Sequence, residues 1–211
     1  MLRKLLLLKL ILLSLSVSLT SWSDNYDELL GEMQSIKANE GSHQAAIAAG
    51  QDRSLLCGYC HGKDGNSVKN YIPNLAQQNP EYLLKQFQLF ATGERKNYVM
   101  QQLAEALTPQ ERIDIALYFS SQKVAVNDVQ KTSKEGQERY QSFCFACHGE
   151  SGLGNKDLPR LAGQKKDFLV KTLNGFKHGE KSRSKSPMVK IMRAVQESEI
   201  EPLAIYISNM Q

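Results

Sequence analysis

The chain has 211 residues, 26 of them basic and 22 acidic, so its formal charge is +4. The charge is unevenly placed: residues 1–23 carry +3, residues 24–127 carry −3 and residues 128–211 carry +4. No basic patch interleaved with aromatic residues appears, which argues against nucleic-acid binding. A field polarised in this way can instead orient a protein as it meets a charged partner.

The first 23 residues predict a secretory signal. A short positive region, Met1 to Lys4, precedes an apolar run over residues 5–19, and small residues near position 23 suit a signal peptidase. We therefore expect residues 1–23 to be removed on export to the periplasm, which leaves enough chain for one medium domain or two small ones. The alternative is an uncleaved membrane anchor, which the short run and Lys9 disfavour.

The next stretch leads into a cysteine motif. Residues 24–43 predict a short helix or a loose arm, and the Ala-rich residues 45–56 predict a helix that continues into Cys57-Gly-Tyr-Cys-His61. On a helix, residues three and four apart share a face. The two cysteines and the histidine of the motif can therefore reach the vinyl groups and the iron of one porphyrin.

Two further helices follow in the first half. Asn79-Pro80 predicts a helix start, because Asn caps well and Pro suits the first helical position, and Gly93 predicts the end. Thr108-Pro-Gln-Glu111 predicts a capping box and a helix to about Gln122. The polar residues 123–133 predict a connector between domains.

The second half repeats this order about 87 residues later, with Cys144-Phe-Ala-Cys-His148 as the second motif. The period is too long for a solenoid unit and indicates two duplicated domains. We expect an N-terminal domain over residues 24–124 and a C-terminal domain over residues 125–211, and both to be all-α because no strand pattern appears. Pro202 is compatible with the last helix if that helix starts near Ser198 and places the proline in its first turn. The other matched segments are Pro159–Ala162 with Pro73–Ala76, Phe168–Lys171 with Tyr82–Lys85, Phe176–Glu180 with Phe90–Glu94, and Tyr206–Ser208 with Tyr118–Ser120.

The two motifs use all four cysteines. Export would favour disulfides, but a disulfide needs no histidine directly after each pair, and the pattern is typical of covalent haem c attachment. The sequence therefore predicts two covalently attached haem c groups. The predicted attachment and proximal residues are Cys57, Cys60, His61, Cys144, Cys147 and His148.

The repeat also selects the second iron ligand of each haem. Met100 lies 39 residues after His61, and Met188 lies 40 residues after His148. Each of these methionines also lies 18 residues before its matched tyrosine. We expect the remaining methionines of the exported chain to fill cores and the remaining histidines to lie at the surface: Met33, Met192, Met210, His43 and His178.

A His/Met pair has a functional consequence. The neutral thioether favours the ferrous state and raises the reduction potential. With both axial positions filled, no position stays open for a substrate, which favours electron transfer over catalysis. The carbonyls near Pro73 and Pro159 are candidates to accept the other N–H of the two axial histidines.

At this point the chain resembles the dihaem class I cytochromes c of the cytochrome c4 type. The resemblance implies two cytochrome c folds related by an approximate two-fold, with the haem edges close across the interface. It also implies a periplasmic electron carrier, loosely membrane-associated, that has no small-molecule substrate. The implied donor is a quinol-cytochrome c reductase or a dehydrogenase, and the implied acceptor is a terminal oxidase. The segments that carry the resemblance are Cys57–Asn66, Pro73–Leu75, Tyr82–Gln86 and Ala116–Gln122, with their counterparts in the second half.

Other functions stay open. The chain fits the cytochrome subunit of a periplasmic dehydrogenase, such as a flavin-dependent sulfide dehydrogenase. A catalytic haem protein, such as a thiosulfate dehydrogenase or a peroxidase, would have one haem without a methionine ligand. A zinc or thiol-redox module is the remaining class. The basic loop that contains Lys181, Arg183 and Lys185 is either a docking site for an acidic partner or a solvated loop.

Overall fold

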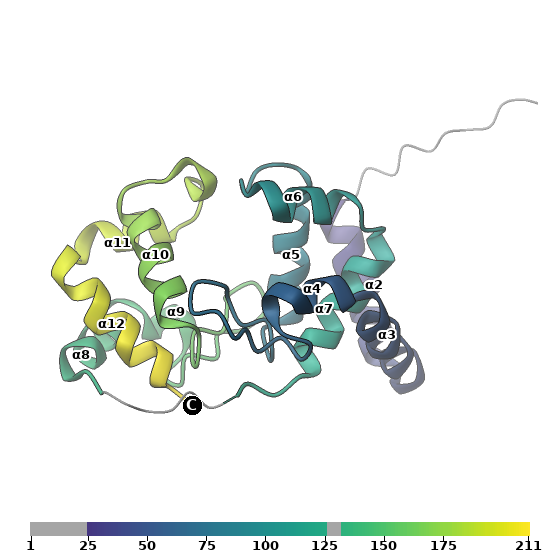
Figure 1. The fold of residues 1–211 in the computed structure, drawn as a ribbon, viewed down its shortest axis with the longest axis horizontal. Coiled ribbons are helices and arrows are strands. Elements are labelled where there is room, and N and C mark those ends of the chain that lie inside the picture. The colour runs from purple at the N-terminus through teal and green to yellow at the C-terminus, as the bar shows by residue number, and fades with distance from the viewer. Residues whose placement is uncertain (1–24, 126–131) are drawn as a thin grey trace, which may run out of the picture.

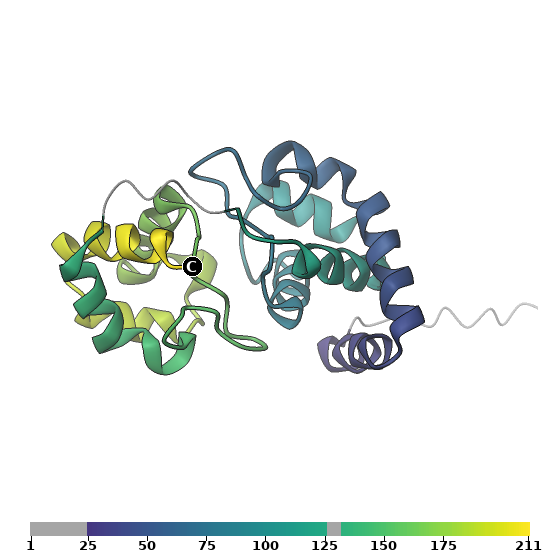
Figure 2. The same ribbon diagram turned by 90° about the horizontal axis from the view of Figure 1, so that it is seen from below.

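A computed structural model describes residues 25–125 and 132–211, and the predicted signal lies outside these ranges. Figures 1 and 2 show two helical lobes side by side, with irregular loops from both lobes between them. We call residues 25–125 the N-terminal lobe and residues 132–211 the C-terminal lobe. The described residues form helices and no strand, apart from one isolated bridge between Asn155 and Leu158, which confirms the all-α prediction. Among the described helices, none is long and apolar enough to cross a membrane.

The two lobes contain the repeated elements in the same order. The N-terminal lobe contains α2 (Tyr26–Ala38), α3 (Glu40–Arg53), α4 (Leu55–His61), α5 (Pro80–Ala91), α6 (Tyr98–Glu105) and α7 (Pro109–Ser121). The C-terminal lobe contains α8 (Lys134–Phe143), α9 (Phe145–His148), α10 (Lys166–Lys177), the 3-10 turn η1 (Lys181–Arg183), α11 (Met188–Ala194) and α12 (Glu197–Asn209). Each lobe has its own hydrophobic core, so each buries its helices independently.

Local signals explain where the helices of the N-terminal lobe begin and end. Pro80 opens α5, and Thr108 forms the predicted capping box with Glu111 at the start of α7. The helix expected over residues 45–56 is two helices, α3 and α4, which meet at Ser54. The segment before them is a helix and not a loose arm: α2 buries Leu29 and Met33 in the core.

In each lobe the helix that precedes the motif helix crosses the last helix at a glycine. A Cβ added at Gly50 of α3 would lie 2.1 Å from the carbonyl oxygen of Asp114 in α7. The equivalent Cβ at Gly136 of α8 would lie 2.1 Å from the carbonyl oxygen of Pro202 in α12. Backbones this close leave no room for a side chain. The two glycines therefore fix the frame that holds the motif helices.

The expectation for Pro202 was wrong. The last helix begins at Glu197, one residue earlier than expected, so Pro202 lies in its second turn and inside the helix. There it cannot donate the usual backbone hydrogen bond to Ser198. The capping box between Gln196 and Glu199 starts the helix ahead of the proline, and the proline carbonyl lies where Gly136 crosses.

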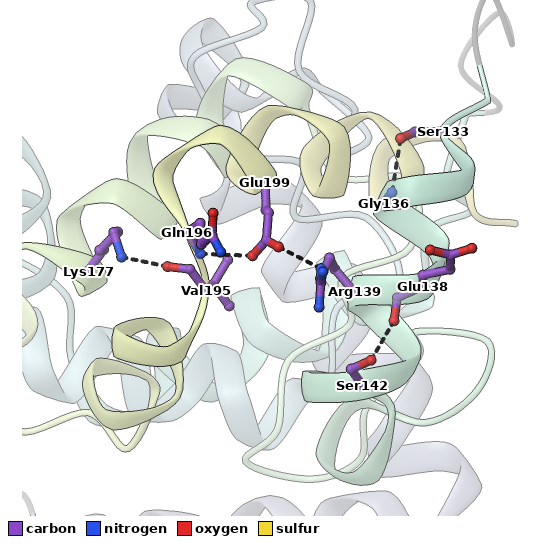
Figure 3. A network of polar contacts seen from close by, with 9 residues as sticks. All are labelled: Ser133, Gly136, Glu138, Arg139, Ser142, Lys177, Val195, Gln196 and Glu199. Atoms are coloured by element: carbon purple, nitrogen blue, oxygen red, sulfur yellow. Dashed lines mark hydrogen bonds and ion pairs between the residues drawn. The ribbon is translucent and has the colours of Figure 1, made fainter.

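A polar network ties together the helices of the C-terminal lobe (Figure 3). Glu199 accepts a hydrogen bond from the Gln196 amide at 2.8 Å and forms an ion pair with Arg139 of α8 at 2.7 Å. Lys177 at the end of α10 donates to the carbonyl of Val195, just before α12. The ion pair links α8 to the start of α12, with Glu199 buried and the Arg139 side chain 40% exposed.

The loops between the lobes form a nearly symmetric interface. The Asn74 amide donates to the Gln164 side chain at 2.7 Å, and the Arg160 amide donates to the Gln78 side chain at 2.7 Å. In the repeat, Asn74 corresponds to Arg160, and Gln78 corresponds to Gln164. The same pair of positions therefore meets twice with the roles of the lobes exchanged, as in a two-fold isologous interface.

Candidate haem centres

His61 lies at the end of α4 with its ring fixed by the backbone. Its Nδ1 lies 2.9 Å from the carbonyl oxygen of Pro73. Since a carbonyl only accepts, the proton is assigned to Nδ1, which leaves the lone pair on Nε2 for a metal. The side chain is 8% exposed, and burial lowers the pKa of His61, against the opposing effect of the Pro73 hydrogen bond. The neutral imidazole that an iron requires is therefore the favoured form.

His148 repeats this geometry at the end of α9. Its Nδ1 lies 3.0 Å from the carbonyl oxygen of Pro159, its side chain is 4% exposed, and burial lowers its pKa. Both expected carbonyl acceptors are thus found. One local arrangement occurs twice, in equivalent positions of the two lobes, which a chance packing contact does not explain.

The four cysteines flank these histidines as free thiols. Cys57 and Cys60 lie on α4, as expected, whereas Cys144 lies between α8 and α9 and only Cys147 lies within α9. Burial raises the pKa of the Cys57 thiol, and it raises the pKa of the Cys144 thiol to about 12. Thiol–disulfide exchange requires a thiolate, and burial disfavours that form at Cys57 and Cys144.

The two candidate methionine ligands pack against the cores that also hold the motifs. Met100 on α6 is partly buried against the N-terminal core, which Cys57 also contacts. Met188 opens α11 and is partly buried against the C-terminal core, which includes Cys144. The structure therefore places one candidate methionine against the same core as each motif, and both side chains keep some exposure.

The other methionines and histidines mostly lie where the sequence predicts. Met33 is 0% exposed and Met192 is 1% exposed, both inside cores, and Met210 packs at the edge of the C-terminal core. The His178 side chain is exposed, 3.5 Å from the carboxylate of Glu197. His43 on α3 is half-buried rather than fully at the surface.

The basic loop of the C-terminal lobe makes contacts within the protein. Lys185 forms an ion pair with Glu94 of the N-terminal lobe at 2.8 Å. The Arg183 guanidinium stacks over the Phe176 ring at 5.3 Å and is hydrogen-bonded to Tyr82 of the N-terminal lobe. Two of its three cations thus join the lobes to each other, which weakens the interpretation of this loop as a docking site.

The residues present fit a covalently attached haem in each lobe. Each lobe offers two thiols, a neutral imidazole oriented through Nδ1, and a thioether on the same core. The C-terminal lobe also holds a buried Arg160 whose Nε has no hydrogen-bond partner among the described residues. The two terminal nitrogens of Arg160 donate to the carbonyls of Ala162 and Ala76, so only its Nε is left to donate to an anionic group such as a haem carboxylate.

Reasoning from the sequence missed four residues that position these centres. Gly50 and Gly136 set the helix crossings, and Gln78 and Gln164 hold the loops that accept the histidine hydrogen bonds. All four obey the repeat, since each pair is separated by 86 residues. The same internal alignment that selected the methionines would therefore have identified them.

Comparisons with known proteins agree on one family. The family model described as cytochrome c matches residues 133–211. A cytochrome c4 from Stutzerimonas stutzeri is 34% identical over 194 residues, which covers 80% of this chain and 91% of that protein. A thiosulfate dehydrogenase electron acceptor from Stutzerimonas stutzeri (strain A1501) is 29% identical over 192 residues, covering 84% of this chain and 85% of that protein.

A solved structure gives the same result for the fold. The crystal structure of reduced recombinant cytochrome c4 from Pseudomonas stutzeri superposes with a TM-score of 0.71 at 32% identity. The match covers 78% of this chain and 98% of that chain, so both lobes are included.

Proposed function

The chain belongs to the cytochrome c4 family, and we propose that it carries electrons in the periplasm between respiratory redox partners, toward a terminal oxidase. Family membership establishes an electron carrier with two covalently attached haem c groups, and not an enzyme.

We assign the first haem to Cys57 and Cys60, which would attach it covalently, and to His61 and Met100, which would ligate its iron. The second haem is assigned to Cys144, Cys147, His148 and Met188. The observation that carries this assignment is the repeated histidine geometry, in which each buried imidazole is held through Nδ1 by the carbonyl of Pro73 or Pro159. Each haem, when bound, supplies one iron that alternates between the ferric and ferrous states.

The chain's own residues favour outer-sphere transfer. The backbone carbonyls fix the two imidazole rings, so a change in iron charge requires little movement of the ligand. Met100 and Met188 would each supply a thioether as a further iron ligand, which would favour the reduced state. With these ligands neither iron would keep an open position, and this property would separate a carrier from a catalytic haem protein.

We further propose that residues 1–23 direct export and are removed, and that the domains comprise residues 24–124 and 125–211. The two separate hydrophobic cores support this division. We also propose a loose association with the membrane, as partner enzymes there would require. Subcellular fractionation tests the export and the membrane association, and the N-terminal sequence of the purified protein tests the removal of residues 1–23.

A second candidate role, in which the protein accepts electrons from a dehydrogenase, has specific support. The likeness to a thiosulfate dehydrogenase electron acceptor indicates that a chain of this type can serve as the outlet of a periplasmic dehydrogenase. This agrees with the alternative of a dehydrogenase cytochrome subunit, with thiosulfate dehydrogenase in place of the flavin-dependent enzyme.

Rapid-mixing kinetics separate the two roles. The reduced protein is mixed with terminal-oxidase membranes, and the oxidised protein is mixed with quinol-cytochrome c reductase or with a thiosulfate dehydrogenase. Fast exchange with the oxidase and the reductase supports the respiratory role. Fast reduction by the dehydrogenase alone supports the second role, and rapid carbon monoxide binding to the reduced protein contradicts both, because it requires an open iron position.

A further inference from the structure

One peptide group in the N-terminal lobe connects a haem ligand to the opposite lobe. The carbonyl of the Pro73–Asn74 peptide accepts the Nδ1 proton of His61 at 2.9 Å. The N–H of the same peptide donates to Oε1 of Gln164 at 2.7 Å. The Gln164 Nε2 donates in turn to the carbonyl of Asn74 at 3.0 Å, so this side chain holds residue 74 from both sides.

The C-terminal lobe has the mirror arrangement. The carbonyl of the Pro159–Arg160 peptide accepts from His148 at 3.0 Å, and the N–H of that peptide donates to Oε1 of Gln78 at 2.7 Å. The Gln78 Nε2 donates to the carbonyl of Arg160 at 2.9 Å. Each histidine is therefore linked, through one peptide group, to a glutamine of the other lobe.

These links are shielded from water. Asn74 is 2% exposed, Arg160 is 3% exposed, and Gln78 and Gln164 are each 4% exposed. Each glutamine Oε1 also accepts the N–H of the residue that follows it, at 3.0 Å from Asn79 and 2.9 Å from Lys165. The glutamine side chains are thus fixed, and no solvent competes for the two peptide groups.

A hydrogen bond at the peptide N–H strengthens the carbonyl of the same peptide as an acceptor, because the two bonds polarise the amide in the same direction. A stronger acceptor draws the Nδ1 proton of the histidine and makes Nε2 a better electron donor. A better donor stabilises ferric iron and lowers the reduction potential. The glutamine therefore acts on the iron through two hydrogen bonds and one amide.

We propose that Gln164 and Gln78 are positioning residues that tune, across the lobe interface, the reduction potential of the haem held by the histidine of the opposite lobe. The inference rests on the proposed ligation by His61 and His148. Its consequence is that each redox centre includes one glutamine of the opposite lobe.

The test uses Gln164→Met, which keeps an unbranched side chain of similar length and removes all three hydrogen bonds of the side-chain amide, two to Asn74 and one from Lys165. Losing the N–H partner should lower the oxidised-to-reduced ratio of the His61 haem about threefold at a fixed solution potential. This corresponds to a rise of about 30 mV in the reduction potential of that haem. The second readout is the Nδ1–H signal of each axial histidine in NMR spectra of the reduced, ¹⁵N-labelled protein. The His61 signal should move upfield while the His148 signal stays in place.

The equivalent variant in the other lobe, Gln78→Met, should raise the potential of the His148 haem and move the His148 signal upfield, and leave the His61 haem and signal unchanged. If one variant fails to fold, the other carries the test. Tyr26→Phe is the matched control, since it removes a different contact between the lobes, the hydrogen bond from Tyr26 to Asp157 at 2.8 Å, and leaves the net charge unchanged. It should move neither potential.

Each result has a distinct meaning. Unchanged potentials in both methionine variants overturn the inference, and so does a shift confined to the haem of the mutated lobe. An equal shift in Tyr26→Phe also overturns it, because that result indicates general loosening of the interface. A wild-type spectrum without an iron-bound histidine overturns the proposed ligation itself, which distinguishes that failure from the others.

Discussion

Gly50 lies directly against the carbonyl of Asp114, and a Cβ at this glycine would come within 2.1 Å of that oxygen. The contact brings α3 and α7 together at backbone distance, just before α4 presents its cysteines and histidine. Replacement of the glycine therefore changes the frame of the N-terminal haem centre.

We expect Gly50→Ala to lower the free energy of unfolding of the N-terminal lobe by about 3 kcal/mol, because two packed backbones must separate to admit a methyl group. Gly31→Ala is the matched control: it lies within α2, and a Cβ there meets nothing within 4 Å. This control should raise the free energy by about 0.5–1 kcal/mol through helix propensity. Denaturant unfolding measures both, and equal effects of the two changes would contradict the close crossing.

Met100→Leu should remove one thioether ligand and lower the potential of one haem, by on the order of 0.1 V. The reduced variant should also bind carbon monoxide at that iron. Redox titration with visible spectra measures both effects. Met192→Leu, a volume-conserving change in the C-terminal core, should cost less than about 1.5 kcal/mol and leave both potentials in place. An unchanged spectrum in Met100→Leu would mean that another residue ligates the iron.

The ion pair between Lys185 and Glu94 should depend on pH. The lysine lowers the pKa of Glu94 through its hydrogen bond and its charge. The contribution of the pair is therefore complete above the unfolded pKa of Glu94 and is lost as the pH falls through the folded pKa.

Lys185→Gln should raise the pKa of Glu94 toward its ordinary range, as measured by NMR titration of its carboxylate carbon. Lys181→Gln removes the same charge from the same loop and should raise the pKa of Glu94 less. If the two variants raise it equally, the effect is one of overall charge and not of the ion pair.

Thr108→Ala should lower the free energy of unfolding by about 1 kcal/mol, because the Thr108 side chain accepts the Glu111 amide at the start of α7. Thr108→Ser keeps the hydroxyl and should cost much less. Thermal unfolding of both variants measures the difference. Equal loss in the serine variant would point to the methyl group and not to the cap.

The sequence by itself determined the local features of this protein. The two cysteine motifs, the capping box at Thr108 and the helix start at Pro80 depend on residues close in the chain, so they could be predicted directly. The capping role expected for Asn79 was wrong, because its side-chain amide donates to the carbonyls of Leu153 and Leu158 in the other lobe. The internal repeat extended prediction to residues far apart in the chain, because its two copies can be aligned with each other. This alignment selected Met100 and Met188 as candidate iron ligands and predicted hydrogen-bond acceptors near Pro73 and Pro159.

Only the tertiary structure decided the features that depend on how separate segments meet. Pro202 lies inside α12 because capping at Gln196 and packing against Gly136 outweigh its lost hydrogen bond. Lys185 pairs with Glu94 across 91 residues of chain, which no local pattern indicates. The reciprocal hydrogen bonds of Gln78 and Gln164, each to a peptide group of the other lobe, likewise form only where the surfaces of the two lobes meet. Local features depend on residues a few positions apart, so the sequence shows them directly. The contacts between distant segments depend on packing, which leaves few buried polar groups unpaired over the whole molecule.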